Sequence, residues 1–155
     1  MKHLKIQQEI LKALLANPET VKYYTTDNGD TFVTVNLKTG YLIPRGVLRL
    51  DLTGAQNTFD PDLASVVRPV NLLQGSDDYR LKGTARRYER LPGSVSAHDT
   101  YIYTELLKHF DNPILYQGPS PLGLIVVTED PLDDGREQIV GIVMPCKVQD
   151  DDVED

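Results

Sequence analysis

The chain has 155 residues, about 40% of them hydrophobic, and its 23 acidic residues outnumber its 16 Lys and Arg to leave a formal net charge of −7. This length suits one domain with one core, and the negative charge excludes a protein that coats nucleic acid through overall basicity. The sequence has no apolar run of about 18 residues that would span a membrane, and it opens without the apolar stretch of a signal peptide. Cys146 is the single cysteine, so no internal disulfide forms. We therefore expect a cytoplasmic protein.

The first third predicts a helix followed by strands. Residues 3–6 predict a short strand, and residues 7–16 carry apolar side chains at helical spacing up to Asn17 and Pro18, where a helix should end. Strands are predicted at residues 21–25, 31–36, 41–43 and 47–52, because β-branched and aromatic residues dominate there or alternate with polar ones. The polar residues 27–30 predict a hairpin turn between the first two strands.

The last third repeats this order. Residues 100–103 predict a short strand and residues 104–110 a short helix, which Asn112 and Pro113 should end. Strands are then predicted at residues 114–117, 122–128 and 138–144, whereas the middle of the chain predicts one extended strand at residues 79–91. From the phase of the periodic segments we predict a core that includes Leu11, Leu14, Leu106, Phe110, Val126, Ile142 and the strand neighbours of Val143.

A strand, a short helix and three strands, stated twice, predict an α+β fold. Two such units lay two helices on one side of antiparallel sheets and close a shared core. We expect a single domain over residues 1–148 and a disordered acidic tail over residues 149–155, which is too charged to pack. Such a tail either keeps the protein soluble or imitates phosphate toward a basic partner.

The residues of both repeats carry a resemblance to the bacterial DNA polymerase sliding clamp. The opening MKHLKIQQEILKALL resembles the first strand and helix of that family, and IYTELLKHF at residues 102–110 resembles a later strand-to-helix entry. The closing IVGIVMPCKV at residues 139–148 is similar to its last strand. The second half also resembles small bacteriophage and prophage proteins in which a helix precedes Asn-Pro and a closing strand ends in Met-Pro, here Met144 and Pro145. The resemblance implies a DNA clamp-like domain of paired strand-helix-three-strand units.

The predicted helices depart from a clamp in their charge. Clamp rings line their hole with basic side chains that meet phosphate, and closing a ring with a chain of this length would need several copies. Here the helices offer Lys12, Lys108 and His109, which Glu9 and Glu105 oppose. A ring around DNA is therefore disfavoured.

A basic stretch in the middle of the chain is the candidate binding site. If this stretch is a single strand, alternate residues share one face. That face would carry four cations and one aromatic ring, a cationic ladder formed by Arg80, Lys82, Arg86, Tyr88 and Arg90. Such a face attracts phosphate or an acidic protein surface. Two alternatives stay open: a solvated face that keeps a sheet edge from aggregating, and pairing with nearby carboxylates of the same chain such as Glu89.

Catalytic motifs are weak in this sequence. The histidines His3, His98 and His109 accompany no nucleophile elbow, the acidic pairs lie in predicted loops without metal-ligand spacing, and no phosphate-binding glycine loop occurs. Cys146, inside an apolar closing segment, is interpreted as a buried small hydrophobe. We expect no enzyme activity, no cofactor and no metal.

Two functions remain. The first is a non-enzymatic interaction protein of phage type that binds a host or phage replication or defence protein in the cytoplasm of a bacterial cell. The alternative is a clamp-like nucleic-acid accessory protein that uses the basic residues 80–90. The sequence leaves open whether the chain forms a homo-oligomer.

Overall fold

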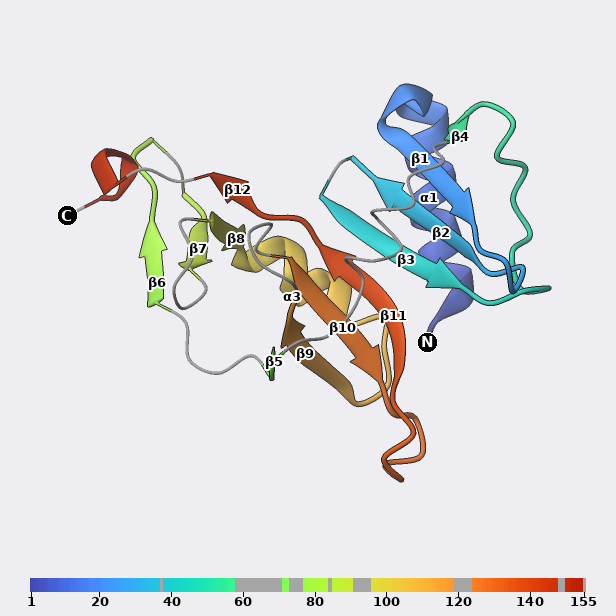
Figure 1. The fold of residues 1–155 in the computed structure, drawn as a ribbon. Helices are drawn as coiled ribbons and strands as arrows, with labels where there is room; N and C mark the ends of the chain where they lie inside the picture. The colour runs from blue at the N-terminus through green and yellow to red at the C-terminus, as the bar shows by residue number, and fades with distance from the viewer. Residues whose placement is uncertain are drawn as a thin grey trace.

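The computed structural model describes residues 1–36, 38–57, 71–72, 77–83, 85–90, 96–118, 124–147 and 150–154. Within these residues a large sheet contains, in spatial order, β4 (Gln56–Asn57), β1 (Val21–Thr25), β2 (Thr31–Val35), β3 (Thr39–Ile43), β11 (Gln138–Val143), β10 (Ile125–Glu129), β9 (Pro113–Gln117) and β5 (Asn71–Leu72). A small sheet contains β12 (Cys146–Lys147), β8 (Ser96–Asp99), β7 (Arg87–Arg90) and β6 (Asp77–Arg80). Every described pairing is antiparallel except that of β1 with β4 (Figure 1).

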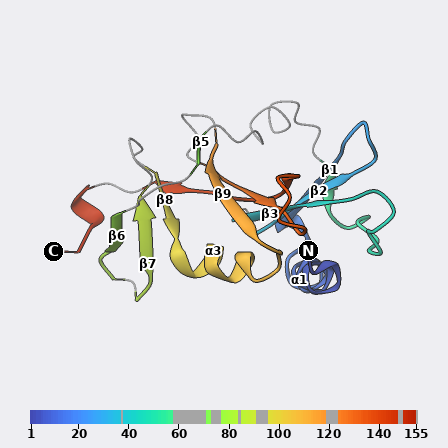
Figure 2. The ribbon, with the colours of Figure 1, turned by 90° about the horizontal axis from the view of Figure 1, so that it is seen from below.

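The helices of the described residues are α1 (His3–Ala16) and α3 (Thr100–Leu107), with short 3-10 helices η1 (Pro18–Thr20) and η2 (Asp150–Asp152). Both α-helices lie on the same face of the large sheet (Figure 2). Neither is long and apolar enough to cross a membrane. The predicted α+β class with two helices on one side of mostly antiparallel strands is confirmed.

The large sheet is built from two units, each a helix followed by three antiparallel strands. In the first unit Val33 of β2 pairs with Tyr41 of β3. In the second, Val127 of β10 pairs with Gly141 of β11. Tyr41 and Gly141 thus hold equivalent positions, and they also pair with each other where β3 meets β11. The two units are therefore joined about an approximate twofold axis at this pair, and the sheet runs without a break from one unit into the other (Figure 1).

One core cluster fills the space between the helices and the sheet. It takes Ile6 and Ile10 from α1, Leu106 and Phe110 from α3 and the turn after it, and alternate residues such as Val127 from the strands. Alternation places Val126 and Ile142 on the opposite face, in a second cluster with Phe32 and Leu124. The predicted core residues Leu106, Phe110, Val126 and Ile142 are buried, while Leu14 and Met144, the other strand neighbour of Val143, are partly buried.

The prediction for Leu11 is wrong, because its side chain is 43% exposed. The buried residues of α1 are Ile6, Gln7, Ile10 and Ala13. At about 100° per residue, position 11 falls on the other side of the helix from positions 6, 10 and 13. The leucines of α1 supply a second apolar row, so apolarity alone does not identify the core-facing side.

The prediction of short strands at residues 3–6 and 100–103 is also wrong, because both segments are helical. Residues 3–6 belong to α1, where the Ile6 amide donates to the Lys2 carbonyl at 3.1 Å. Residues 100–103 belong to α3, and the strand before it, β8, ends at Asp99. A run of four residues fits the periods of a strand and of a helix equally well, so the longer helix that follows decides its state.

Residues 47–52 alternate as a strand would, yet they form no strand in the structure. Leu52 is buried in the main core, and Val47, Leu48 and Leu50 pack against it. The buried Gln7 side chain takes the place of a neighbouring strand: its Nε2 donates to the Val47 carbonyl at 3.0 Å, and its Oε1 accepts from the Arg49 amide at 2.7 Å. The alternating pattern therefore predicted correctly that these residues pack against the core. The Gln7 side chain, and not a neighbouring strand, forms hydrogen bonds with the backbone of Val47 and Arg49.

The remaining predicted strands agree with β1, β2, β3, β9, β10 and β11 to within a few residues. Residues 37 and 122–123, which fall in or beside predicted strands, lie outside the described residues.

Candidate functional site

The predicted single strand at residues 79–91 is a hairpin instead. Arg80 lies on β6, Tyr88 and Arg90 lie on β7, and Lys82 and Arg86 lie in the connection. The chain reverses near Gly83, whose φ of +77° is a conformation that suits glycine.

The register of this hairpin separates the predicted ladder. Arg80 pairs with Arg87, and Tyr79 pairs with Tyr88. Opposite residues share a face and successive residues alternate, so Arg80 lies on the other face from Tyr88 and Arg90. The one-sided arrangement of all five residues is therefore wrong, because a turn inside the segment resets the alternation.

The face that holds Tyr88 and Arg90 is packed within the chain. The rings of Tyr79 and Tyr88 stack with centroids 6.5 Å apart, and the Arg90 guanidinium lies 5.3 Å from the Tyr79 centroid. Burial raises the pKa of Tyr79, although the nearby Arg90 opposes the shift. These side chains act as a small internal stack of the hairpin.

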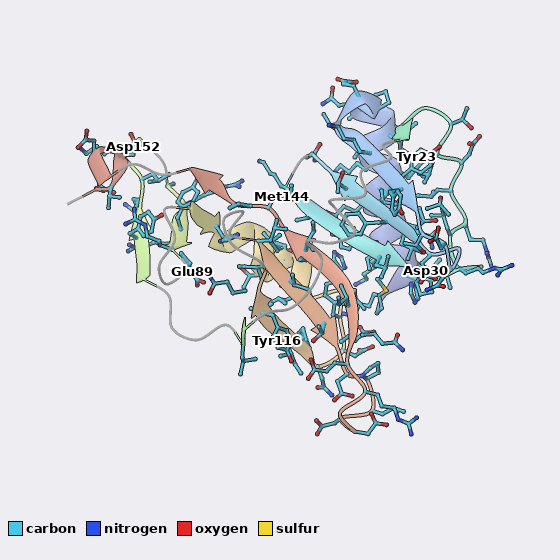
Figure 3. All side chains as sticks on the ribbon, viewed as in Figure 1. Tyr23, Asp30, Glu89, Tyr116, Met144 and Asp152 are labelled. Carbon is cyan, nitrogen blue, oxygen red and sulfur yellow. The ribbon has the colours of Figure 1, made fainter. Side chains whose placement is uncertain are left out.

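The acidic end of the chain covers the free edge of β6. Leu81 forms a β-bridge with Val153, the Lys82 amide donates to the Asp152 carbonyl, and the Glu154 amide donates to the Arg80 carbonyl, each hydrogen bond being 2.8 Å. The Nε of Arg80 lies 3.7 Å from a carboxylate oxygen of Glu154. Figure 3 labels Asp152 in this segment and Glu89 on β7, the strand at the other side of β6.

This arrangement differs from the disordered tail that composition predicts for residues 149–155. Residues 150–154 form η2 and the bridge to Leu81, while residues 149 and 155 lie outside the described residues. The physical reason is that an unpaired strand edge offers backbone partners, which a polar segment can use without burying apolar side chains.

A groove of about 550 Å³ lies between α1 and α3 over the strand β3. Its floor contains Val35, Tyr41 and Leu106, which are almost fully buried. Its rim carries the helix residues Glu9, Lys12 and Glu105, His109 from the turn after α3, and the cations Lys38 and Arg86. A volume in this range is typical of small-molecule sites.

Glu9 is the centre of the polar contacts in this groove. The Tyr41 hydroxyl donates to its Oε2 at 2.8 Å, and Nε2 of His109 lies 3.2 Å from the same oxygen. Because a carboxylate oxygen only accepts, His109 serves as a donor here. Burial, with the charge of Glu9 second, raises the pKa of the Tyr41 hydroxyl far above its ordinary value of 10.0. This network links α1 and β3 to the turn that follows α3.

The two carboxylates that line the groove, those of Glu9 and Glu105, both have polar partners within the chain. Glu105 receives a 2.6 Å contact from Lys108, which does not line the groove. In the described part of the chain, no carboxylate lies within 4.0 Å of the ammonium groups of Lys12 and Lys38. The rim therefore has an excess of positive charge despite the acidic chain.

The outer side of α1 carries a row of exposed leucines. Leu4, Leu11 and Leu15 are 76%, 43% and 79% exposed. Positions 4, 11 and 15 fall within about 40° of one another around a helix, away from the buried side of α1. Lys5 and Lys12 lie on the flank of this row that leads to the groove.

The other candidate residues lie elsewhere. His98 is fully buried on β8, directly opposite Glu89 of β7, and Cys146 is exposed, which corrects its interpretation as a buried hydrophobe. Among the described residues, no group of three His, Cys, Asp or Glu side chains is placed to hold a metal ion.

Comparison with known proteins leaves the geometry as the guide to function. No protein-family model, curated protein or solved structure matches the chain.

The groove residues Glu9, Lys12, Glu105 and His109 were predicted as charges of the helices, but the sequence did not predict that they lie in one groove. Tyr41 and Lys38 were not predicted as groove residues, although the repeated order of helix and strands indicates where the two helices meet. Two equivalent units that share one core place their helices side by side, and Tyr41 lies on the strand that joins the units.

Proposed function

We propose that the protein is a non-enzymatic interaction protein that binds a protein partner along the outer side of α1. The observation that carries this proposal is the leucine row of Leu4, Leu11 and Leu15. Single exposed leucines are normal on protein surfaces, whereas three aligned on one helix form a seam that a partner helix or groove accepts.

The partner that fits this seam is an amphipathic segment with acidic side chains. Lys5 and Lys12 border the row on one flank, and no carboxylate of the described residues lies within 4.0 Å of either ammonium group. Two copies of α1 packed antiparallel along this seam would bring these lysines close to one another, which disfavours self-association. The resemblance to clamp and phage proteins supports a replication or defence protein of a bacterial cell as the partner.

The basic hairpin supports the nucleic-acid alternative less well. Its cations face two directions, and Arg80 has Glu154 within ion-pair distance. Nucleic-acid binding would need several cations directed at one phosphate backbone.

The experiment compares two variants with matched exposure. Leu4→Glu combined with Leu15→Glu should abolish co-purification of a stoichiometric protein from bacterial lysate, because charged side chains break the seam. Leu132→Glu is the control, since Leu132 is also 76% exposed but lies in the loop after β10. Equal recovery of the same partner by the double variant and by Leu132→Glu would contradict the proposal.

A further inference from the structure

The groove between α1 and α3 is distinct from the leucine row and has its own chemistry. We infer that it binds a small organic anion, an apolar body carrying a phosphate monoester. This inference does not depend on the proposed protein partner.

The size and floor of the groove account for the apolar body. A volume of about 550 Å³ accepts a ring or a short chain rather than an isolated inorganic ion. The floor of the groove is closed by Val35, Tyr41 and Leu106, each of them 1–2% exposed. These side chains belong to the main core, so the floor is held rigidly in place.

The charges of the rim account for the phosphate. The Glu9 carboxylate keeps its negative charge, but its Oε2 is directed at the Tyr41 hydroxyl and at Nε2 of His109. Glu105 is likewise engaged by Lys108. Within the described residues, no carboxylate lies within 4.0 Å of the ammonium groups of Lys12 and Lys38, which leaves two unpaired positive charges. A phosphate monoester carries close to two negative charges at neutral pH and matches them.

The backbone on the Lys38 side of the groove is fixed. The Lys38 amide donates to the Val35 carbonyl at 3.1 Å, and its carbonyl accepts from the Met144 amide at 2.7 Å. Asn36 begins this turn with a φ of 55°, the left-handed conformation that Asn tolerates. Lys12 lies in the third turn of α1 and also lines the groove. Both cations therefore extend from backbone that is held by hydrogen bonds.

The test is a titration of the purified full chain with phenyl phosphate, followed by NMR at the imidazole of His109 and the ring of Tyr41. We expect saturable shifts at both residues. Inorganic phosphate and phenol, which each supply half of the ligand, should bind more weakly than phenyl phosphate. Lys12→Gln and Lys38→Gln should each weaken binding of phenyl phosphate about three- to tenfold. Lys22→Gln is the matched control, because Lys22 lies on β1 and does not line the groove.

Three results would overturn the inference: no saturable shift at His109 and Tyr41, unchanged affinity in both groove variants, or inorganic phosphate binding as tightly as phenyl phosphate. The outcome is separable from that of the protein partner. Lys38 does not belong to α1, and the leucine variants leave the groove side chains in place.

Discussion

Gly141, which pairs with Tyr41 at the approximate twofold axis, determines how side chains pack at the centre of the large sheet. Tyr41 and Gly141 hold equivalent positions, yet one has a large side chain and the other has none. A Cβ at Gly141 would lie 2.9 Å from the Gly40 carbonyl oxygen and 3.2 Å from Cζ of Phe110. The missing side chain thus makes room for Phe110, which lies against Tyr41 with centroids 6.3 Å apart.

Gly141→Ala should therefore destabilise the protein by about 1–3 kcal/mol, because the backbone carbonyl of Gly40 cannot move aside in a paired strand. Urea denaturation measures this free energy. Gly54→Ala is the control, since a Cβ there would meet only Pro18, at 4.0 Å. Equal stability of the two variants would show that the centre of the sheet relaxes more easily than its geometry indicates.

Tyr41 should make the stability depend on alkaline pH. Its pKa in the folded chain is raised above the ordinary 10.0, first by burial and then by Glu9, so the unfolded chain ionises first. Stability is present in full below about pH 10 and falls as the pH rises, by up to about 1.4 kcal/mol per pH unit from this group.

Tyr41→Phe removes the ionisable hydroxyl and with it this part of the alkaline loss. The variant should be less stable at neutral pH by about 1 kcal/mol, because the hydrogen bond to Glu9 is lost. The measurement is the free energy of unfolding at about pH 9 and about pH 11 in both proteins, which cancels the titration of the other tyrosines and the lysines. A decline of the same size in both proteins would contradict the assignment.

At the scale of elements, α1 is apolar on two sides and only one of them faces the core. Ile6 and Ile10 are fully buried, while Leu4 and Leu15 are more than three-quarters exposed. The segment at residues 79–91 shows the related limit for strands, because its alternation was assumed to run through a turn. In both segments the sequence predicted the local periodicity correctly. It did not predict which side of α1 faces the core, nor that a turn interrupts residues 79–91.

Leu106→Ala and Leu11→Ala separate the core from the outer row. Leu106 is 2% exposed, so its truncation should cost about 2–4 kcal/mol, through lost burial and the cavity left behind. Leu11, 43% exposed, should cost less than about 1 kcal/mol. Thermal or urea unfolding gives both values, and a Leu11 variant as unstable as the Leu106 variant would place that leucine in the core.

At the scale of the whole molecule, the two units share one sheet and one core. β3 of the first unit pairs with β11 of the second, and one core cluster contains residues of both helices. Because the two units bury apolar side chains in a shared cluster, the described sheet should act as one cooperative unit.

Amide hydrogen exchange in increasing urea tests this directly. The amides of β2 and of β10 should reach the same free energy of opening and the same dependence on urea, because they open in one global event. The control is an amide of the loop at residues 131–137, which should exchange through local fluctuation. Distinct free energies for β2 and β10 would show that the two units unfold separately.

Local sequence signals are enough to predict the class of the fold and most strands of the large sheet. Segments such as residues 31–35 and 125–129 are dense in β-branched residues. Pro18 follows α1 and precedes β1, and Pro113 follows α3 and begins β9. These signals are local, so they survive without knowledge of the partner segments.

Which residues contact one another depends on how distant segments pack. Glu9, Tyr41 and His109 come together because β3 pairs with β11, a contact between segments about a hundred residues apart that no local period encodes. The same holds for Gln7, whose side chain replaces a strand partner for residues 47–49, and for residues 150–154 on the edge of β6. Burial, pairing and the groove depend on the other surface in each contact, and that surface is brought into place only when the chain folds.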